Sequence, residues 1–407
     1  MSHVIVVGAG PGGAVLSLLL ARAGVRVTLL ERHTDFSREF RGEVLMPSGL
    51  EPFEQMGLWE KFDAVPHVPI AQIRAFVGGR LIQGLEIDRE HFGRFGPRWV
   101  SQPPLLEMLV AEAGRLPNFS LERGASVRHL LAEQGRTSGV GILTPDGERE
   151  ARADLVVGAD GRTSIVRRRS GASARPDPTP MDIVWLKLPM HDFEDDAERR
   201  SFRVYVGGGH LLIAAPTPDD KFQIAWVIRK GSFGDLRERG LPAAIHEMAR
   251  HADPLLAAHL RAHAEDAIQP FLLSTVSDYV EDWAAPGRLL IGDAAHTMSP
   301  VGAQGINMAI RDAVVAARHL GPVLAGDASH ADIDRAAAAV QAERSHEIRA
   351  IQKLQRRAPP VILNDYWWNR ALLSILPRFA RGQIHRPRNS GVFGRFAWGV
   401  SEVRVKG

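Results

Sequence analysis

The sequence contains no cysteine, which excludes disulfide bonds, thiolate nucleophiles, iron–sulfur clusters and cysteine-ligated zinc sites. Any redox chemistry must therefore come from a bound organic cofactor. The sequence also lacks a long apolar run and a basic, cleavable leader, because it enters the apolar strand Val4–Val7 almost at once. Together these absences predict a cytoplasmic protein without a membrane span.

The excess of positive charge is small, since 50 Lys and Arg residues stand against 47 Asp and Glu residues, a formal net charge of +3. No concentrated basic face is evident before the C-terminal region, so we expect no nucleic-acid partner. The histidines are scattered and no Ser/His/Asp order stands out, so the sequence predicts no metal site and identifies no catalytic base. A length of 407 residues, of which 45% are hydrophobic, favours two globular domains.

A glycine-rich turn directly follows the first strand. Within the segment 8–13 (GAGPGG), Gly8 permits a tight turn, Gly10 lets the backbone approach a pyrophosphate, and Gly13 lets the next helix pack close to the strand. We expect that helix over residues 14–23. This arrangement is typical of dinucleotide binding and does not by itself distinguish FAD from NAD.

An acidic residue ends the second predicted strand, which covers Arg26–Leu30. Glu31 lies 18 residues past Gly13, close to the spacing expected for a carboxylate that accepts a ribose hydroxyl. The strand, helix, second strand and terminal acid therefore occur in the register of a dinucleotide-binding βαβ unit.

Two later segments repeat the pattern of a strand that ends in an acid. Arg288–Ile291 is an apolar strand, and Asp293 follows it at the edge of the sheet where ligands of open α/β sheets bind. Residues 154–160 form another apolar strand that ends in Asp160 and Gly161, a pair that is also a common turn former. An NAD-dependent dehydrogenase would leave Asp293 without a role.

The segment 302–307 (GAQGIN) precedes a predicted amphipathic helix over Met308–Leu320. Its glycines let backbone N–H groups face a ligand, and the start of a helix carries partial positive charge. The alternative interpretation is a glycine-rich connection without a ligand.

In this order and at these separations, the three segments resemble the FAD-dependent aromatic hydroxylase family, the single-component flavoprotein monooxygenases typified by para-hydroxybenzoate hydroxylase. The resemblance covers nearly the whole chain, and its most specific part is Gly292-Asp293, followed after six residues by Pro300. It implies that Asp293 holds a ribityl hydroxyl of FAD, and that the helix start after Gly302 stabilises the anionic reduced flavin. It also implies that Asp160 is linked to both FAD and NAD(P)H.

The same resemblance suggests contacts elsewhere in the chain. It implies that Arg41 contacts the cofactor or the reducing nucleotide, that Gln102 contacts FAD, and that the backbone of Val127 touches the adenine. The respective alternatives are a surface arginine, a helix-capping side chain and an ordinary strand residue. The predicted cofactor-binding set is Gly8, Gly10, Pro11, Gly12, Gly13, Glu31, Arg32, Arg41, Gln102, Val127, Asp160, Asp293, Pro300, Gly302, Gln304, Gly305, Ile306 and Asn307.

The predicted fold class is α/β, with a Rossmann-like FAD-binding domain, a β-sheet substrate domain and a helical C-terminal region. We expect the FAD-binding domain to comprise residues 1–174, with a small sheet insertion near 70–100, together with residues 285–345. The substrate domain is expected over 175–284 and the C-terminal region over 346–407.

Strand-like segments separated by turn residues predict an antiparallel sheet in the substrate domain. The predicted strands are 183–187, 202–206, 211–215 and 222–228, with helices near 241–250 and 254–262. In the family such a sheet roofs the flavin ring, so several of its polar and aromatic side chains are candidates for the pocket lining. An aromatic residue on a sheet is more often part of the core. The candidates are Trp185, Arg203, Tyr205, His210 and Trp226.

Large apolar and basic side chains are mixed in the C-terminal region, from Tyr366-Trp367-Trp368 to Arg388. This mixture suits a weak membrane-surface contact, a lid over a bulky apolar substrate, a dimer interface or a helix packed on the domain with snorkelling arginines. A monomer and a homodimer are both compatible with the sequence.

The activity that the resemblance implies is that of an FAD-dependent NAD(P)H monooxygenase. NADH or NADPH reduces FAD, O2 adds to the reduced flavin, and a flavin C4a-hydroperoxide hydroxylates an aromatic or polycyclic metabolite. The alternatives are a related FAD-dependent reductase or oxidase acting on a quinone or isoprenoid substrate, a flavin-dependent halogenase, and a non-catalytic or NAD-only binding protein. The substrate, the position of hydroxylation and the choice of nucleotide are left open.

Overall fold

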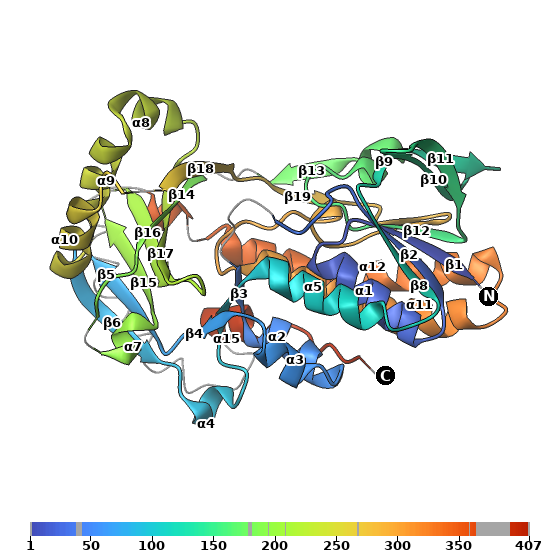
Figure 1. Ribbon diagram of the computed structural model, residues 1–407, viewed down its shortest axis with the longest axis horizontal. Helices are drawn as coiled ribbons and strands as arrows, with labels where there is room; N and C mark the ends of the chain where they lie inside the picture. The colour runs from blue at the N-terminus through green and yellow to red at the C-terminus, as the bar shows by residue number, and fades with distance from the viewer. Residues whose placement is uncertain are drawn as a thin grey trace.

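The computed structural model describes residues 2–37, 43–177, 181–193, 195–207, 209–266, 268–357, 359–363 and 391–405. Two large sheets with their covering helices lie beside one another along the long axis of the molecule (Figure 1). The Trp- and Arg-rich segment from Tyr366 to Arg388, for which four roles were considered, lies outside the described residues, as does Arg41.

A six-stranded sheet with a mainly parallel arrangement forms the centre of the first part. Its order is β20 (Ala284–Ala285), β21 (Arg288–Leu290), β12 (Leu155–Gly158), β1 (His3–Val7), β2 (Arg26–Glu31) and β8 (Phe119–Arg123). β1 pairs in parallel with both β2 and β12, and β12 pairs in parallel with β21. The carboxyl ends of these strands therefore meet at one edge of the sheet.

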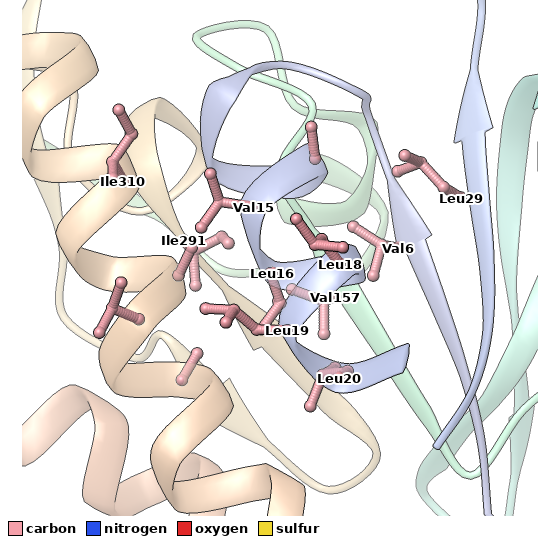
Figure 2. Close-up of a cluster of buried hydrophobic side chains, with 14 of the residues drawn as sticks. Val6, Val15, Leu16, Leu18, Leu19, Leu20, Leu29, Val157, Ile291 and Ile310 are labelled. Carbon is pink, nitrogen blue, oxygen red and sulfur yellow. The ribbon is translucent and has the colours of Figure 1, made fainter. Parts of the chain in front are cut away.

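Helices cover the six-stranded sheet on the side opposite the three-stranded sheet β11 (Gly147–Arg152), β10 (Arg136–Thr144) and β9 (Ser126–Glu133) (Figure 1). These helices are α1 (Pro11–Arg22), α5 (Gln102–Ala113), α11 (Gln304–Ala325) and α12 (His330–Gln355). α1 is apolar on nearly all sides because it packs between the sheet and both α11 and α5. Figure 2 shows this core, with Val15, Leu16, Leu18, Leu19 and Leu20 of α1 among Val6, Leu29, Val157, Ile291 and Ile310.

A seven-stranded sheet forms the second part of the molecule. Its order is β18 (Ile268–Ser274), β14 (Met181–Pro189), β17 (Lys221–Arg229), β16 (His210–Pro216), β15 (Ser201–Gly207), β5 (Gln72–Val77) and β6 (Arg80–Glu86). The four strands predicted between residues 183 and 228 lie in β14 to β17, which pair antiparallel with one another as expected.

The expectation of a separate small sheet near residues 70–100 is wrong for β5 and β6. β5 pairs in parallel with β15, and Phe76 of β5 stacks on Tyr205 of β15 with 4.5 Å between the ring centroids. The physical reason is that β15 would otherwise present an open edge, which a strand from elsewhere in the chain completes.

The two faces of the seven-stranded sheet pack against different partners. On the outer face, side chains such as Val184, Leu212 and Trp226 pack against α8 (Phe233–Arg239), α9 (Leu241–Ala249) and α10 (Pro254–Ala262), which lie at the far end of the molecule from the first part (Figure 1). On the inner face, Ile183 and Ala225 lie in a cluster that also contacts Val301, a residue of the first part. Alternation of side chains along each strand produces this division.

Short elements join and flank the two sheets. They are β3 (Glu43–Leu45), β7 (Arg98–Val100) and β4 (His67–Pro69) in one small sheet, β13 (Ala174–Asp177) with β19 (Ser277–Val280) in another, and α2 (Pro47–Gln55), α3 (Trp59–Asp63), α4 (Arg89–Phe92), α6 (Ile165–Arg169), α7 (Asp196–Arg199), the 3-10 turn η1 (Gly292–Ala294), α13 (Pro359–Ile362) and α15 (Gly391–Trp398). The predicted boundary at residue 345 falls inside α12, so the helix continues through it. Across the part of the chain that the structure describes, each helix is too short or too polar to cross a bilayer.

A buried network of charged side chains connects α11 with α12. Arg311 donates to Glu347 through Nε (3.1 Å to Oε2) and Nη2 (2.9 Å to Oε1), and Arg344 donates through Nε to Asp312 Oδ1 (2.7 Å) and through Nη1 to Glu347. Each of these four side chains is at most 2% exposed. Burial alone would raise the pKa of Glu347, but the charges of Arg344 and Arg311 outweigh it and hold that pKa well below its usual range.

We expect Glu347→Gln to lower the free energy of unfolding by about 3–5 kcal/mol at neutral pH, because it leaves buried arginines without their anion. The lowered pKa of Glu347 means that its stabilisation is complete above the ordinary glutamate pKa of about 4.3 and is lost as the pH falls toward the folded-state value. Between pH 7 and pH 3, the free energy of unfolding should therefore fall less in the variant than in the wild type, as measured by denaturant unfolding.

The matched control is Glu343→Gln on the same helix. Glu343 pairs with Arg318 and lies 2.8 Å from His319, and its side chain is 32% exposed, so its loss should change stability by less than about 1 kcal/mol. Equal effects of the two substitutions would contradict a special role for the buried network.

Candidate functional site

Three turns that are distant in the sequence meet at the carboxyl edge of the six-stranded sheet. Gly8 has a φ of +99°, and a Cβ at this position would lie 2.6 Å from the carbonyl oxygen of Ala159. A Cβ on Gly12 would lie 3.1 Å from the carbonyl oxygen of Ala309, and one on Gly292 would lie 3.2 Å from the Cβ of Ala309. The turns after β1, β12 and β21 and the first turns of α11 therefore form one continuous region.

Gly10 differs from the glycines around it. Its φ of −67° is accessible to any residue, and a Cβ built on it would meet no described atom within 4 Å. A Cβ on Gly13, in contrast, would lie 2.0 Å from the carbonyl oxygen of Gly8, so Gly13 is required for the packing of α1 against the turn. The backbone at Gly10 borders open space at the start of a helix, which is the environment of a bound anion.

Glu31 lies where the sequence places it, next to the glycine-rich turn. Its Oε2 accepts a hydrogen bond from the Ala9 N–H at 3.0 Å, its Oε1 accepts one from the His33 N–H at 3.1 Å, and the residue is 3% exposed. The carboxylate thus supports the turn that follows β1. Arg32 is exposed, and its Nε lies 2.9 Å from His33 Nε2.

Asp293 projects from η1 toward the start of α11. Its Oδ2 lies 3.4 Å from Arg162 Nε, and its Oδ1 lies 4.0 Å from the position that a Cβ on Gly305 would occupy. The Asp293 side chain is 26% exposed, so the carboxylate is accessible at the edge. Arg162 is a member of this site that the sequence reasoning did not single out, although it follows the Asp160-Gly161 pair directly.

The start of α11 has an unusual backbone. Gly302 has a φ of +76°, and Ala303, the N-cap residue, has a φ of +53°, which is rare for alanine and is a form of strain found at functional sites. Ala303 also has no side chain that can cap the helix, so the first N–H groups of α11 receive no partner from the cap. The sequence carries no signal for this conformation of Ala303.

The side chains of Gln304 and Asn307 are committed to the protein. Gln304 Nε2 donates to the carbonyl oxygens of Gly302 (2.6 Å) and Phe396 (3.0 Å). Asn307 Nδ2 donates to Val44 O at 3.1 Å, and Asn307 Oδ1 accepts from the Met46 N–H at 2.9 Å. These amides hold the loop in place, which leaves their backbone groups to contact a cofactor.

Asp160 serves as a cap for α6. Its carboxylate accepts hydrogen bonds from Ser164 Oγ and from the N–H groups of Ile165 (2.6 Å) and Val166 (3.2 Å). Burial raises the pKa of Asp160, partly offset by these bonds. The structure thus provides a local role for this acid beside Gly8, and its link to FAD and NAD(P)H stays a prediction. The contacts predicted for Gln102, the first residue of α5, and for the buried Val127 in β9 also stay predictions.

The substrate-domain candidates divide between the two faces of the seven-stranded sheet. Tyr205 and Trp226 lie in the outer cluster under the helices, and Tyr205 donates to Asp253 Oδ2 at 2.7 Å. Arg203 is 2% exposed and pairs with Asp253 and Glu198 on the same face. Trp185 packs on the inner face, against the clusters that contact the first part. Of these candidates, Trp185 has the position of a pocket residue.

The histidines are less scattered in space than in the sequence. His210 of β16 lies near His251 and Glu247 of the α9 region, and the potential ligand atoms of the three residues are within 4.8 Å of one another. The sequence could not show this grouping, because it depends on how α9 packs against the sheet, and the absence of a metal site stays a prediction. The cluster lies on the outer side, away from the carboxyl edge described above.

Comparison with known proteins agrees with this geometry. A family model described as an FAD binding domain matches residues 1–350. The chain is 32% identical over 411 residues to 6-methylpretetramide 4-monooxygenase from Streptomyces rimosus, with 100% of this chain and 94% of that protein covered.

Two solved structures share the fold. The crystal structure of P. aeruginosa PqsL in complex with 2-aminobenzoylacetate has a TM-score of 0.78 at 21% identity, with 93% of this chain and 99% of that chain covered. A ternary complex of aklavinone-11 hydroxylase with FAD and aklavinone has a TM-score of 0.71 at 22% identity, with 89% and 68% covered.

The residues at the carboxyl edge fit FAD, which the family match establishes as the cofactor. The open backbone at Gly10 suits the pyrophosphate, Glu31 suits a ribose, and Asp293 suits the ribityl chain. The uncapped start of α11 lies on the same edge, where its partial positive charge suits the pyrimidine side of a reduced flavin.

We expect Asp293→Ala to lower FAD affinity by about 10- to 100-fold, the effect of losing a hydrogen bond to a charged group. Flavin absorbance of the purified protein and titration of the apoprotein with FAD measure this change. Arg162→Gln is the control, because it removes the ion pair and keeps the carboxylate. If Arg162→Gln loses as much flavin as Asp293→Ala, the ion pair rather than a ribityl contact is responsible.

We expect Gly10→Ala to fold with an unchanged melting temperature and to bind FAD at least about tenfold more weakly. The new methyl group meets no described protein atom within 4 Å and would occupy space that the pyrophosphate needs. Gly84→Ala, in β6, is a matched control, since a Cβ there also meets no described atom within 4 Å. Normal flavin content in Gly10→Ala would show that no ligand approaches this backbone.

Proposed function

This chain belongs to the family of FAD-dependent monooxygenases, and we propose that it uses NAD(P)H and O2 to hydroxylate an aromatic or polycyclic metabolite. The observation that carries the proposal is the meeting of Gly10, Glu31 and Asp293 with the start of α11 at one edge of the sheet. The apolar inner face of the second sheet packs toward this edge through Val301.

The overall reaction consumes one aromatic C–H, one O2, one NAD(P)H and one proton, and it yields a C–OH, NAD(P)+ and water. FAD, when bound, supplies the acceptor for the hydride and the activation of O2. The contribution of the chain is to bind and orient the two molecules and to exclude water. The N–H groups at the start of α11 stabilise negative charge, and Asp293 and Glu31 fix the cofactor by its hydroxyl groups.

The inner face of the sheet supports an apolar, fused-ring substrate. Ile183, Leu211, Ala225 and Val227 form its centre, and partly buried Val204 and Ile213 pack against them. The name of the relative at 32% identity gives 6-methylpretetramide as the compound on which that enzyme acts. The alternative of an FAD-dependent reductase or oxidase is not favoured, because the relatives are monooxygenases and hydroxylases.

The test is NAD(P)H oxidation by the purified holoenzyme, screened against mono- and polycyclic phenols under isotopically heavy O2. We expect substrate-stimulated oxidation and a product that gains one labelled oxygen atom by mass spectrometry. Stimulated oxidation that yields only hydrogen peroxide, without a labelled product from any member of the panel, would support an oxidase instead.

Three further properties of the protein stay predictions from the sequence. They are a cytoplasmic location, a monomeric or homodimeric state, and a weak membrane-surface contact through the C-terminal region.

A further inference from the structure

Two polar side chains interrupt the otherwise apolar centre of the inner sheet face. Gln223 lies on β17 between Phe222 and Ile224, which face outward, and therefore shares the inner face with Ala225. Trp185 lies on β14 opposite Ala225, and the register that pairs Lys187 with Gln223 places Trp185 and Gln223 diagonally on adjacent strands. Diagonal neighbours on one face are within reach of long side chains.

Both side chains carry a buried donor without a hydrogen-bond partner. Gln223 is 1% exposed, and its Nε2 has no partner, nor has the Nε1 of Trp185. Leaving a buried N–H unsatisfied is unfavourable, and most such groups in proteins have a partner. These two lie diagonally on the face that contacts the first part of the molecule, so one acceptor held between the two parts can accept from both.

The position of these donors connects them to the flavin-binding edge. Trp185 packs against both inner clusters, one of which contacts Ala303 and the other Val301. These two residues flank Gly302 in the loop between Pro300 and α11. A molecule held by Trp185 therefore lies between the substrate sheet and that loop.

We infer that Gln223 and Trp185 form a subsite that binds a ring carbonyl oxygen of the substrate, an inference that rests on the proposed function. The indole N–H can only donate, so its partner must be an acceptor. A carbonyl oxygen has two lone pairs and can accept from both N–H groups at once. Lys187, opposite Gln223 on this face, pairs with Asp219 at 2.7 Å, so its charge is already compensated and a neutral acceptor is favoured over a carboxylate.

The experiment measures binding to the oxidised holoenzyme, which requires no turnover. The two probes are a hydroxyanthraquinone, which carries ring carbonyl oxygens, and the matching hydroxyanthracene, which lacks them. Changes in the visible flavin spectrum report the dissociation constant of each. We expect Gln223→Leu and Trp185→Phe each to weaken binding of the hydroxyanthraquinone by about five- to tenfold and to leave that of the hydroxyanthracene within twofold.

A matched control is available on the other face of the same sheet. Trp226 Nε1 is also buried without a hydrogen-bond partner, but its ring lies in the outer cluster under the helices. Trp226→Phe makes the same chemical change as Trp185→Phe and should leave both dissociation constants unchanged. Gln223→Leu should not lower the melting temperature, because it removes an unsatisfied buried group rather than a structural bond.

Three results would overturn the inference. They are unchanged binding of the hydroxyanthraquinone in both variants, equal weakening for both probes, and no binding of the hydroxyanthraquinone to the wild type. The oxygenation screen is independent of these results. A labelled product from the wild type, together with unaffected binding in the variants, would reject the subsite and retain the monooxygenase activity. Selective loss of hydroxyanthraquinone binding in the variants, without any oxygenated product from the wild type, would retain the subsite and reject the monooxygenase activity.

Discussion

The buried carboxylate of Asp312 fixes the turn that carries Asp293, the acid proposed to bind the flavin cofactor. Its Oδ2 accepts a hydrogen bond from the Gly292 N–H at 3.0 Å and lies 2.6 Å from His296 Nε2, so it holds both ends of the turn that carries Asp293. Burial opposes the charge of Asp312, but His296 and Arg344 outweigh it and keep its pKa below the usual range. The position of Asp293 at the sheet edge therefore depends on a carboxylate that is itself fully buried.

The second sheet separates two tasks by the alternation of its side chains. Its outer face packs under the helices in a core with Tyr205 and Trp226, where Asp253 accepts from the Tyr205 hydroxyl and pairs with Arg203. Its inner face contains smaller aliphatic residues and the two unsatisfied donors. Alternation of side chains thus gives the sheet one face that packs against helices and one face that contacts the first part of the molecule.

Local patterns were sufficient to predict much of the fold and part of the site. The βαβ unit that ends in Glu31 and the antiparallel strands from β14 to β17 are confirmed, because their signals lie within a few residues. The pairing of β5 with β15 and the gathering of His210 with His251 were not predictable, since they depend on contacts between distant segments. The capping role of Asp160 was weighed as a turn, but its bonds to α6 could not be identified before the helix was placed.

The C-terminal segment takes part in the loop that leads into α11. Gln304 donates to Phe396 O, and the ring of Phe396 lies so close to Gly302 that a Cβ there would be 2.8 Å away. The backbone N–H of Val400 also donates to Glu347 in the buried network, at 2.6 Å. Residues 396–400 therefore brace both the loop and the buried network behind it, so displacement of this short segment would disturb the entry to α11 and the network together.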